Sequence, residues 1–312
     1  MKKLVVSSSP HIHTKTSTPG VMLDVVIALI PLVIAGFLIF GWEALLVVGI
    51  CVATSVLSEA IFNLITKKEQ TIADFSAVVT GLILGLSLPA DADIWWECII
   101  GSVFAIVVVK CFFGGLGCNF ANPAATGRIF IFLSFSTTIG RGAFPVAAEL
   151  TSSATPLEVI RGGAEISELP SLLDMFLGVR GGAVGETCIA AILLGFIYLV
   201  IRRVIHFETP IIFAATVFAL SLIAYGSFEM ALYQLLSGAV LFAAVFMATD
   251  YVTTPITRTG KMIFAFGCGL ITFVIRFYGS YPEGVSFALL IMNIISPYIE
   301  KLTAKVPLGG KK

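Results

Sequence analysis

The side chains best suited to covalent chemistry form a hydroxyl-rich segment, residues 151–155 (TSSAT), followed directly by Pro156. An accessible Ser or Thr hydroxyl can be esterified, and a Thr placed before Pro also caps the start of a helix. Glu158, three residues after Thr155, completes a capping-box pattern. The segment therefore predicts a helix that begins after Thr155, and the same hydroxyl remains available for covalent modification.

A second segment, residues 114–124 (GGLGCNFANPA), combines glycines with Asn119 and Asn122. Glycine permits close backbone approach, and a carboxamide both donates and accepts hydrogen bonds, as the polar edge of a heteroaromatic ligand requires. A tight turn between two helices, capped by asparagine, explains the same residues. Asn122-Pro123-Ala124 also matches the water-channel tripeptide, but those channels need two such motifs within six spans. The ligand-binding and turn interpretations both stay open.

Three acids, Asp24, Glu186 and Asp250, lie in or at the ends of apolar stretches. Ionised groups are costly inside a membrane and are normally paired or functional. Asp250 ends an apolar run and is followed by Thr253 and Thr254, whose oxygens could join its carboxylate in binding a small cation or passing a proton. These acids are therefore candidates for an ion or proton path.

The alternative is that the charged groups are paired or reach the membrane surface. Arg258 and Lys261 are close enough in the sequence to pair with Asp250. Lys110 and Arg276 are expected to extend their charged ends to the interface, as long basic side chains do near helix ends.

Composition defines the elements that must position these residues. Of 312 residues, 58% are hydrophobic and 12% are charged, and the mean hydropathy is +1.02. A soluble fold of this length cannot bury so much apolar surface, so we expect an integral membrane protein. The net charge of zero gives no basic field for a nucleic acid. The six cysteines are scattered without a CxxC pair, so no metal site is expected.

Apolar runs along the chain predict about ten transmembrane helices. Continuous runs favour helices over barrel strands, which alternate in polarity over about ten residues. Several runs are shorter than the roughly 20 residues of a straight span, which suggests half-helices or spans shielded by neighbours. The runs are 21–40, 44–65, 75–88, 95–113, 121–139, 187–201, 210–225, 232–249, 262–277 and 285–299.

The distribution of Lys and Arg predicts the orientation. When alternate loops are grouped, fifteen of the 19 basic residues fall on one side of the membrane and four on the other. Cytoplasmic loops are enriched in basic residues, so we expect both termini in the cytoplasm and a multi-pass protein of the cell (inner) membrane. The long hydrophilic segment 141–186 then lies outside the cytoplasm.

The two halves share a faint pattern. Residues 81–91 resemble 238–250, and 119–124 has a counterpart at 281–286. The matching segments are five spans apart, so they lie on opposite sides of the membrane, as in an inverted-topology repeat. We therefore predict an all-α membrane protein with two inverted five-helix repeats. Its parts are a cytoplasmic N-terminal segment 1–20, repeats 21–139 and 187–299, an extracytoplasmic loop 140–186 and a cytoplasmic tail 300–312.

Short motifs in a fixed order cover nearly the whole chain: Ser9-Pro10-His11, Leu86–Pro89, Gly114–Gly117, Asn122–Ala124, Gly185–Thr187, Phe246–Asp250 and Tyr281–Gly284. This order resembles the family formed by the D subunit of Rnf-type ion-translocating ferredoxin:NAD oxidoreductase complexes and the related B subunit of the sodium-translocating NADH:quinone reductase. In that family, the last threonine of an S/T-x-A-T-like motif carries FMN through a phosphoester. The matching residues are Ser153, Ala154 and Thr155, and the family's usual Asp six residues before the threonine is Glu149 here.

The resemblance implies covalent FMN on Thr155 and a non-covalent riboflavin at Asn119 and Asn122. Arg161 and Arg180, each followed by two glycines, could supply guanidinium groups near the FMN phosphate. The chain would be a flavin-containing electron-transfer subunit of a Na⁺- or H⁺-translocating ferredoxin:NAD oxidoreductase, and not catalytically complete alone. Its partners would be the lipid bilayer and the other subunits, including a second extracytoplasmic FMN subunit and membrane iron–sulfur subunits.

The competing interpretation is a secondary transporter or channel of inverted-repeat architecture without a redox cofactor. Broken spans and polar groups within the membrane suit both classes of protein. A purely structural scaffold would leave the threonine motif without a purpose. A fluorescent flavin band on a denaturing gel would separate a covalent flavoprotein from the other two classes.

Overall fold

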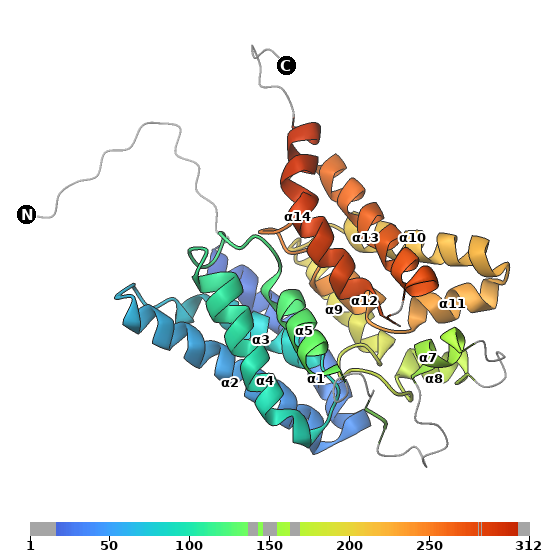
Figure 1. Cartoon of the computed structure of the whole chain (residues 1–312), viewed down its shortest axis with the longest axis horizontal. Coiled ribbons are helices and arrows are strands. Elements are labelled where there is room, and N and C mark those ends of the chain that lie inside the picture. The colour runs from blue at the N-terminus through green and yellow to red at the C-terminus, as the bar shows by residue number, and fades with distance from the viewer. Residues whose placement is uncertain are drawn as a thin grey trace, which may run out of the picture.

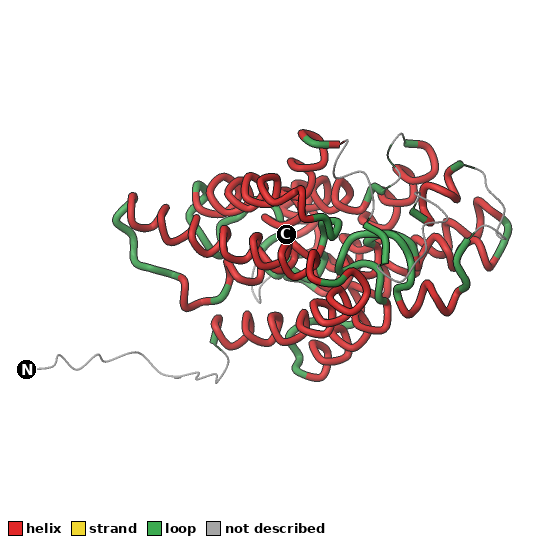
Figure 2. Tube along the Cα trace, turned by 90° about the horizontal axis from the view of Figure 1, so that it is seen from below, coloured by secondary structure: helices red, strands yellow, loops and turns green. Residues whose placement is uncertain are grey.

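The computed structural model describes residues 17–136, 143–145, 155–162, 169–279, 281 and 283–304. Within these ranges the chain consists of helices joined by turns, with one isolated antiparallel bridge between Ala143 and Gly182. Figure 2 shows helix along most of the trace and no strand in the described part. The all-α prediction is therefore confirmed. Ser153, Ala154 and both ends of the chain lie outside the described residues.

The helices form two groups that follow one another along the chain, coloured blue to green and yellow to red in Figure 1. The first group contains α1 (Thr18–Phe40), α2 (Trp42–Ile65), η1 (Ile72–Asp74), α3 (Ser76–Leu86), η2 (Ala92–Ile94), α4 (Trp95–Val103), η3 (Phe104–Cys111) and α5 (Pro123–Ser134). η3 is a π-helix that continues α4 without a break.

The second group begins with two short helices, α7 (Pro156–Arg161) and α8 (Leu172–Leu177). It continues with α9 (Ile189–Ile201), α10 (Glu208–Tyr225), α11 (Phe228–Leu236), α12 (Val240–Phe246), α13 (Arg258–Tyr278) and α14 (Val285–Thr303). Each of the ten predicted apolar runs thus contains helix, although the helices differ greatly in length.

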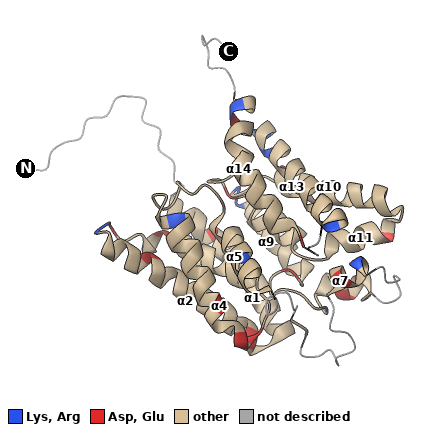
Figure 3. Ribbon diagram, in the orientation of Figure 1, with Lys and Arg blue, Asp and Glu red and all other residues tan. Residues whose placement is uncertain are grey.

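Among the described residues, five helices are long and apolar enough to cross a membrane: α1, α2, α10, α13 and α14. The pair α11 and α12, bent by 54°, makes a sixth if it is one span. Apolar helices of this length satisfy their own backbone hydrogen bonds in lipid. The chain is therefore a multi-pass membrane protein, and α3 and α9 are shorter apolar helices. Figure 3 shows how few charged residues, coloured blue and red, lie along the helices.

Side-chain caps set the starts of several helices. Ser17 accepts a hydrogen bond from Gly20 N at the start of α1, and Thr257 accepts one from Gly260 N at the start of α13. Asn122 accepts one from Ala125 N at the start of α5. Each cap satisfies a backbone donor that the first helical turn leaves free.

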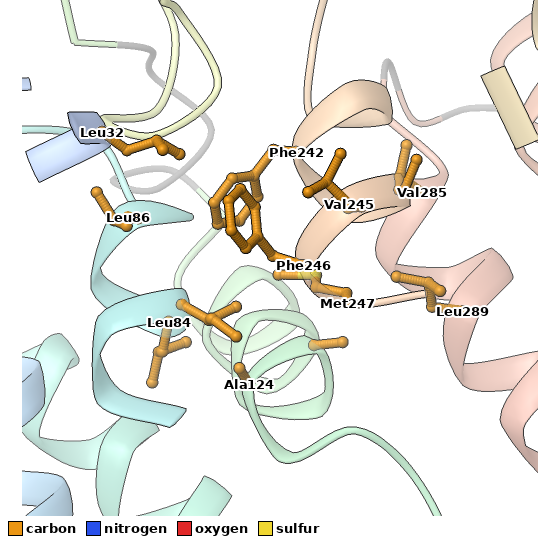
Figure 4. Packing of buried hydrophobic residues seen from close by; sticks show 14 of the residues in the cluster. Leu32, Leu84, Leu86, Ala124, Phe242, Val245, Phe246, Met247, Val285 and Leu289 are labelled. Carbon is orange, nitrogen blue, oxygen red and sulfur yellow. The ribbon is translucent and has the colours of Figure 1, made fainter. Parts of the chain in front are cut away.

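The apolar core joins the two groups of helices. Leu84 and Leu86 of α3 belong to the same buried cluster as Phe242 and Phe246 of α12 and Leu289 of α14. Figure 4 shows the rings of Phe242 and Phe246 extending from α12 towards Leu84 and Leu86 of α3. The packing therefore ties the two halves into one body around residues of α3 and α12.

Candidate functional sites

A cavity with a volume of about 340 Å³ has Thr155 in its wall. We call it the Thr155 cavity. Its other polar wall residues come from five parts of the chain: Ser87 after α3, Arg128 of α5 and Ser136 after it, Glu158 of α7, Arg180 and Glu186 between α8 and α9, and Glu283 and Ser286 at the start of α14. Residues far apart in the sequence thus meet around the predicted attachment residue.

Thr155 is the N-cap of α7, as the sequence predicted. Glu158 Oε2 accepts hydrogen bonds from Thr155 N at 2.9 Å and from Thr155 Oγ1 at 3.1 Å. The side chain is half-buried. The hydroxyl is thus held at the cavity wall by a carboxylate, and the cap and a covalent role are compatible in this geometry.

The segment between α8 and α9 is held against the end of α3 by backbone hydrogen bonds. Gly185 N donates to Leu86 O at 2.7 Å, and Val184 N donates to Leu88 O at 3.0 Å. A Cβ at Gly185 would lie 2.7 Å from the Cβ of Leu86, so only glycine fits this approach. This contact positions Glu186, the next residue, at the cavity.

An ionic cluster forms one wall of the cavity. Arg128 Nη2 forms a close ion pair with Glu283 Oε2 and lies 3.8 Å from Glu186 Oε2. The guanidinium of Arg276 of α13 lies against Gly238, where an added Cβ would be only 2.6 Å from Arg276 Nη2. It donates hydrogen bonds to the carbonyls of Gln234 at 2.6 Å and Ser237 at 3.1 Å. The expectation that Arg276 extends to the membrane surface was wrong, because these buried carbonyls bind its guanidinium.

Glu186 is the least satisfied member of this cluster. Its Oε1 accepts a hydrogen bond from Ala183 N at 3.0 Å, whereas its Oε2 is buried and has no hydrogen-bond partner among the described residues. Arg180 donates to the backbone carbonyls of Glu186 and Thr187, and not to the carboxylate. Burial, reinforced by the negative charge of Glu283 and opposed by Arg128, raises the pKa of Glu186 to about 7.

The Thr155 cavity fits a ligand with an aromatic ring and polar edges. Its volume lies near the lower end of the roughly 300–1,000 Å³ typical of small-molecule pockets. Ile129, Phe132 and Phe287 supply apolar wall, and the free oxygen of Glu186 supplies an unused acceptor. A flavin joined through its phosphate to Thr155 is chemically compatible with this combination.

One predicted residue of this site lies away from the cavity. Arg161 is exposed and donates to the Gly279 carbonyl at 3.1 Å, and it is not part of the cavity wall. Arg180, which was predicted beside Arg161, lies in the cavity wall, and so does Arg128. Ser153 and Ala154 lie outside the described residues.

A second, smaller cavity of about 80 Å³ contains Asn119, Asn122 and Asp250 in its wall, together with Lys110. We call it the Asn122 cavity. Asn122 caps α5 through Ala125 N at 3.1 Å, which confirms the capped-turn interpretation for this residue. The buried Oδ1 of Asn119 has no hydrogen-bond partner in the described part of the chain. The cavity is several times smaller than the pockets that hold flavin-sized ligands, so its present shape suits water or a small ion.

Asp250 has no ion pair among the described residues. Its carboxylate accepts hydrogen bonds from Val252 N and Thr253 Oγ1, both at 3.1 Å, and from Asn122 Nδ2 at 3.4 Å. The proposed partner Arg258 pairs with Glu208 of α10 instead. The expectation of a salt bridge from Asp250 to Arg258 was therefore wrong.

Asp24 forms an ion pair that connects the two halves. Its carboxylate binds Arg202 Nε at 3.1 Å and accepts from Tyr198 Oη at 2.9 Å, both near the end of α9. Because Arg202 is more than half exposed, this pair contributes little to stability. Asp24 therefore has a structural role in joining α1 to α9, and it lies in the wall of neither the Thr155 cavity nor the Asn122 cavity.

A buried pair beside the Asn122 cavity was not predicted from the sequence. Lys110 Nζ donates to both carboxylate oxygens of Glu59 at 3.0 Å and to Ser76 Oγ at 2.6 Å. Lys110 is 1% exposed and Glu59 is 2% exposed. The expectation that Lys110 reaches the membrane interface was therefore wrong. The sequence signal that could have predicted the pair is Glu59, an acid within a long apolar run, because such an acid needs a partner inside the protein.

The helices and cavities define a multi-pass α-helical membrane protein with polar sites buried between its two halves. Residues 5–309 match the model of the NQR2, RnfD, RnfE family. The chain belongs to this family. The expected resemblance is therefore confirmed.

Named relatives match over almost the entire chain. The D subunit of a Na(+)-translocating ferredoxin:NAD(+) oxidoreductase complex from Acetobacterium woodii is 44% identical, with 99% of this chain and 96% of the relative covered. The D subunit of a proton-translocating ferredoxin:NAD(+) oxidoreductase complex from Clostridium ljungdahlii is 34% identical, with 98% and 96% covered. The D subunit of an ion-translocating oxidoreductase complex from Stutzerimonas stutzeri is 35% identical, with 92% and 91% covered.

Proposed function

We propose that this chain is the D subunit of an ion-translocating ferredoxin:NAD oxidoreductase complex and carries electrons through bound flavin. The family and the relatives support membership of such a complex. Electrons would be exchanged with a second extracytoplasmic FMN subunit and with membrane iron–sulfur subunits. The reactions of ferredoxin and nicotinamide belong to those partners, so the chain is a part of an enzyme rather than a complete one.

FMN is attached in this proposal to Thr155, with its ring in the Thr155 cavity. The observation that carries the proposal is that the threonine of the motif forms part of the wall of a cavity of about 340 Å³. Bound FMN would supply one- and two-electron transfer, while the protein supplies orientation, hydrogen bonds and exclusion of water. Glu158 holds the Thr155 hydroxyl, and Arg128 and Arg180 place positive charge on the cavity wall.

The direct test is to purify the complex and separate it on a denaturing gel. We expect a fluorescent band at the mass of this chain, and peptide mapping should place the FMN mass on Thr155. A colourless, non-fluorescent chain would support the competing class, a secondary transporter or channel without a redox cofactor.

A second flavin, riboflavin, is proposed at Asn119 and Asn122. The unpartnered Asn119 oxygen supports a ligand in the Asn122 cavity. The cavity volume of about 80 Å³ means that its walls would have to separate before a flavin ring could enter. The support for riboflavin is thus weaker than that for FMN.

The positions of the two cavities favour the proposed inverted repeat. The Thr155 cavity combines the segment after α3 with the start of α14, and the Asn122 cavity combines the segment after α12 with the start of α5. Each cavity therefore joins the end of the third predicted apolar run of one half (75–88 or 232–249) to the start of the fifth run of the other half (285–299 or 121–139). An inverted repeat places such equivalent sites on opposite sides of the membrane.

We place both termini in the cytoplasm and the Thr155 cavity towards the outside, following the fifteen-to-four distribution of basic residues. The boundaries remain those proposed from the sequence: repeats 21–139 and 187–299, flavin-bearing loop 140–186, and cytoplasmic ends 1–20 and 300–312. For an ion path, Asp250 and Glu186 lie at the cavities, whereas Asp24 is paired with Arg202. Either Na⁺ or H⁺ fits this proposal.

A further inference from the structure

Two carboxylates share one guanidinium in the wall of the Thr155 cavity. Arg128 Nη2 contacts Glu283 Oε2 closely and lies 3.8 Å from Glu186 Oε2. Both acids are largely shielded from solvent, with side-chain exposures of 20% for Glu283 and 11% for Glu186. Two negative charges this close to one cation cannot be stabilised equally, so one acid should take up a proton more readily than the other.

Hydrogen bonding identifies Glu186 as the acid that is protonated first. Glu283 has the close contact to Arg128 and accepts a further hydrogen bond from Ala239 N. Burial alone would raise the pKa of Glu283, but Arg128 and Arg276 lower it below its usual value. Glu186 accepts one hydrogen bond, from Ala183 N. Its other oxygen is buried at the cavity with no hydrogen-bond partner among the described residues and has only the 3.8 Å contact to Arg128.

We propose that Glu186 is the proton-exchanging group of the Thr155 cavity, binding a proton from water when negative charge enters the cavity and releasing it when that charge leaves. This inference rests on the proposed function, because the negative charge is an electron delivered to flavin by a flavin or iron–sulfur donor of a neighbouring subunit. Each electron that arrives is matched by one proton, and one O–H bond forms at Glu186 Oε2.

Comparison with the other charged groups around Glu186 identifies Glu186 as the site of proton uptake. Guanidinium groups remain protonated throughout the neutral range, and Glu283 is stabilised in its ionised form by two of them. Glu158 accepts hydrogen bonds from both Thr155 N and Thr155 Oγ1. The charged groups facing the cluster are Arg128 of α5, Glu158 of α7, Arg180 of the same segment as Glu186, Arg276 of α13 and Glu283 before α14.

The first test uses the complete complex with Thr155→Ala, which removes the proposed attachment point but leaves the cluster intact. Infrared difference spectra between acid and alkaline buffer should show a protonated-carboxyl band that titrates near neutral pH. Glu186→Gln should remove this band, and Glu229→Gln, a change at an exposed acid of α11, should not. Glu283→Gln should move the titration to lower pH, because Arg128 is then free to pair with Glu186. A band that survives Glu186→Gln would overturn the proposal.

The second test measures the midpoint potential of the flavin as a function of pH in the complex with Thr155 intact. We expect the potential to fall with pH through the neutral range, and to fall less steeply in Glu186→Gln. If Glu186→Gln does not assemble, Glu186→Asp keeps a carboxyl and should shift the midpoint of the titration. An unchanged slope in Glu186→Gln would overturn the coupling to the electron. Absence of flavin from Thr155 would instead contradict the proposed function. The infrared test of proton binding at Glu186 would still be valid, because it does not depend on attached flavin.

Discussion

Asn122 caps the start of α5 and donates a hydrogen bond to Asp250 across 128 residues of sequence, with 3.4 Å between Nδ2 and Oδ2. One carboxamide therefore caps a helix in the first half and binds a partly buried carboxylate in the second. The groups that donate hydrogen bonds to the Asp250 carboxylate are neutral, namely a backbone N–H, a hydroxyl and this amide. An isolated carboxylate in such a setting is suited to binding a proton or a small cation.

Asp250→Asn should uncouple ion movement from electron transfer. The amide keeps the size of the side chain, so we expect the complex to assemble with its flavins and to retain electron transfer. The gradient formed per electron should fall, because the charge that attracts the ion is gone. Gradient formation and electron transfer measured in the same vesicles give this ratio.

Asp91→Asn is the matched control for that experiment. Asp91 follows α3 as Asp250 follows α12, but it is exposed and caps η2 through Asp93 N. Its substitution should leave the ratio unchanged. An unchanged ratio in Asp250→Asn as well would remove Asp250 from the ion path.

Thr155→Ala should abolish covalent flavin, whereas Thr155→Ser should retain part of it because the hydroxyl persists. Loss of the cap of α7 costs only about 1 kcal/mol, so both variants should assemble. In-gel fluorescence compared with the amount of subunit measures attachment. An FMN mass on Thr151 or Ser153 in the unmodified protein would show that the attachment site lies elsewhere in the segment.

Asn119→Leu should lower the acid-extractable riboflavin of the complex without changing its covalent FMN. Removing one partner of a buried polar ligand costs about 1–3 kcal/mol, enough to reduce occupancy at limiting riboflavin. Asn122→Leu should lower riboflavin too, but it also removes the cap of α5 and the bond to Asp250. If Asn119→Leu leaves the riboflavin content unchanged, the turn that contains Asn119 and Asn122 has only a structural role.

Local patterns in the sequence predicted local features of the structure. The helix start at Thr155, the Asn122 cap and the apolar helices follow from spacing along a few turns of chain. The ionic cluster could not be predicted in this way, because Arg128, Glu186 and Glu283 come from three distant segments. The packing of the two halves against each other determines which charged residues form pairs. Short sequence motifs do not contain this information.

The orientation of the chain can be tested with its own thiol. Cys118 is exposed in the loop before α5, which we place in the cytoplasm. In intact cells an impermeant thiol reagent should leave Cys118 unlabelled, whereas a cysteine introduced at Ser167 should react. Ser167 belongs to the proposed outside loop and lies outside the described residues. Labelling of Cys118 without labelling at position 167 would invert the proposed topology.

The buried pair of Lys110 and Glu59 predicts strong coupling between the two residues. Removing one partner leaves an unpaired charge in an apolar environment and destabilises a protein by about 3–5 kcal/mol. Lys110→Met and Glu59→Gln should therefore each lower the thermal midpoint of the purified complex. The double variant leaves no isolated charge, so its midpoint should fall by less than the sum of the single effects. Glu43→Gln, at an exposed acid of the same helix as Glu59, should leave the midpoint nearly unchanged. Additive losses in the double variant would show that the 3.0 Å contact contributes little and that the lysine and the acid are stabilised by other neighbours.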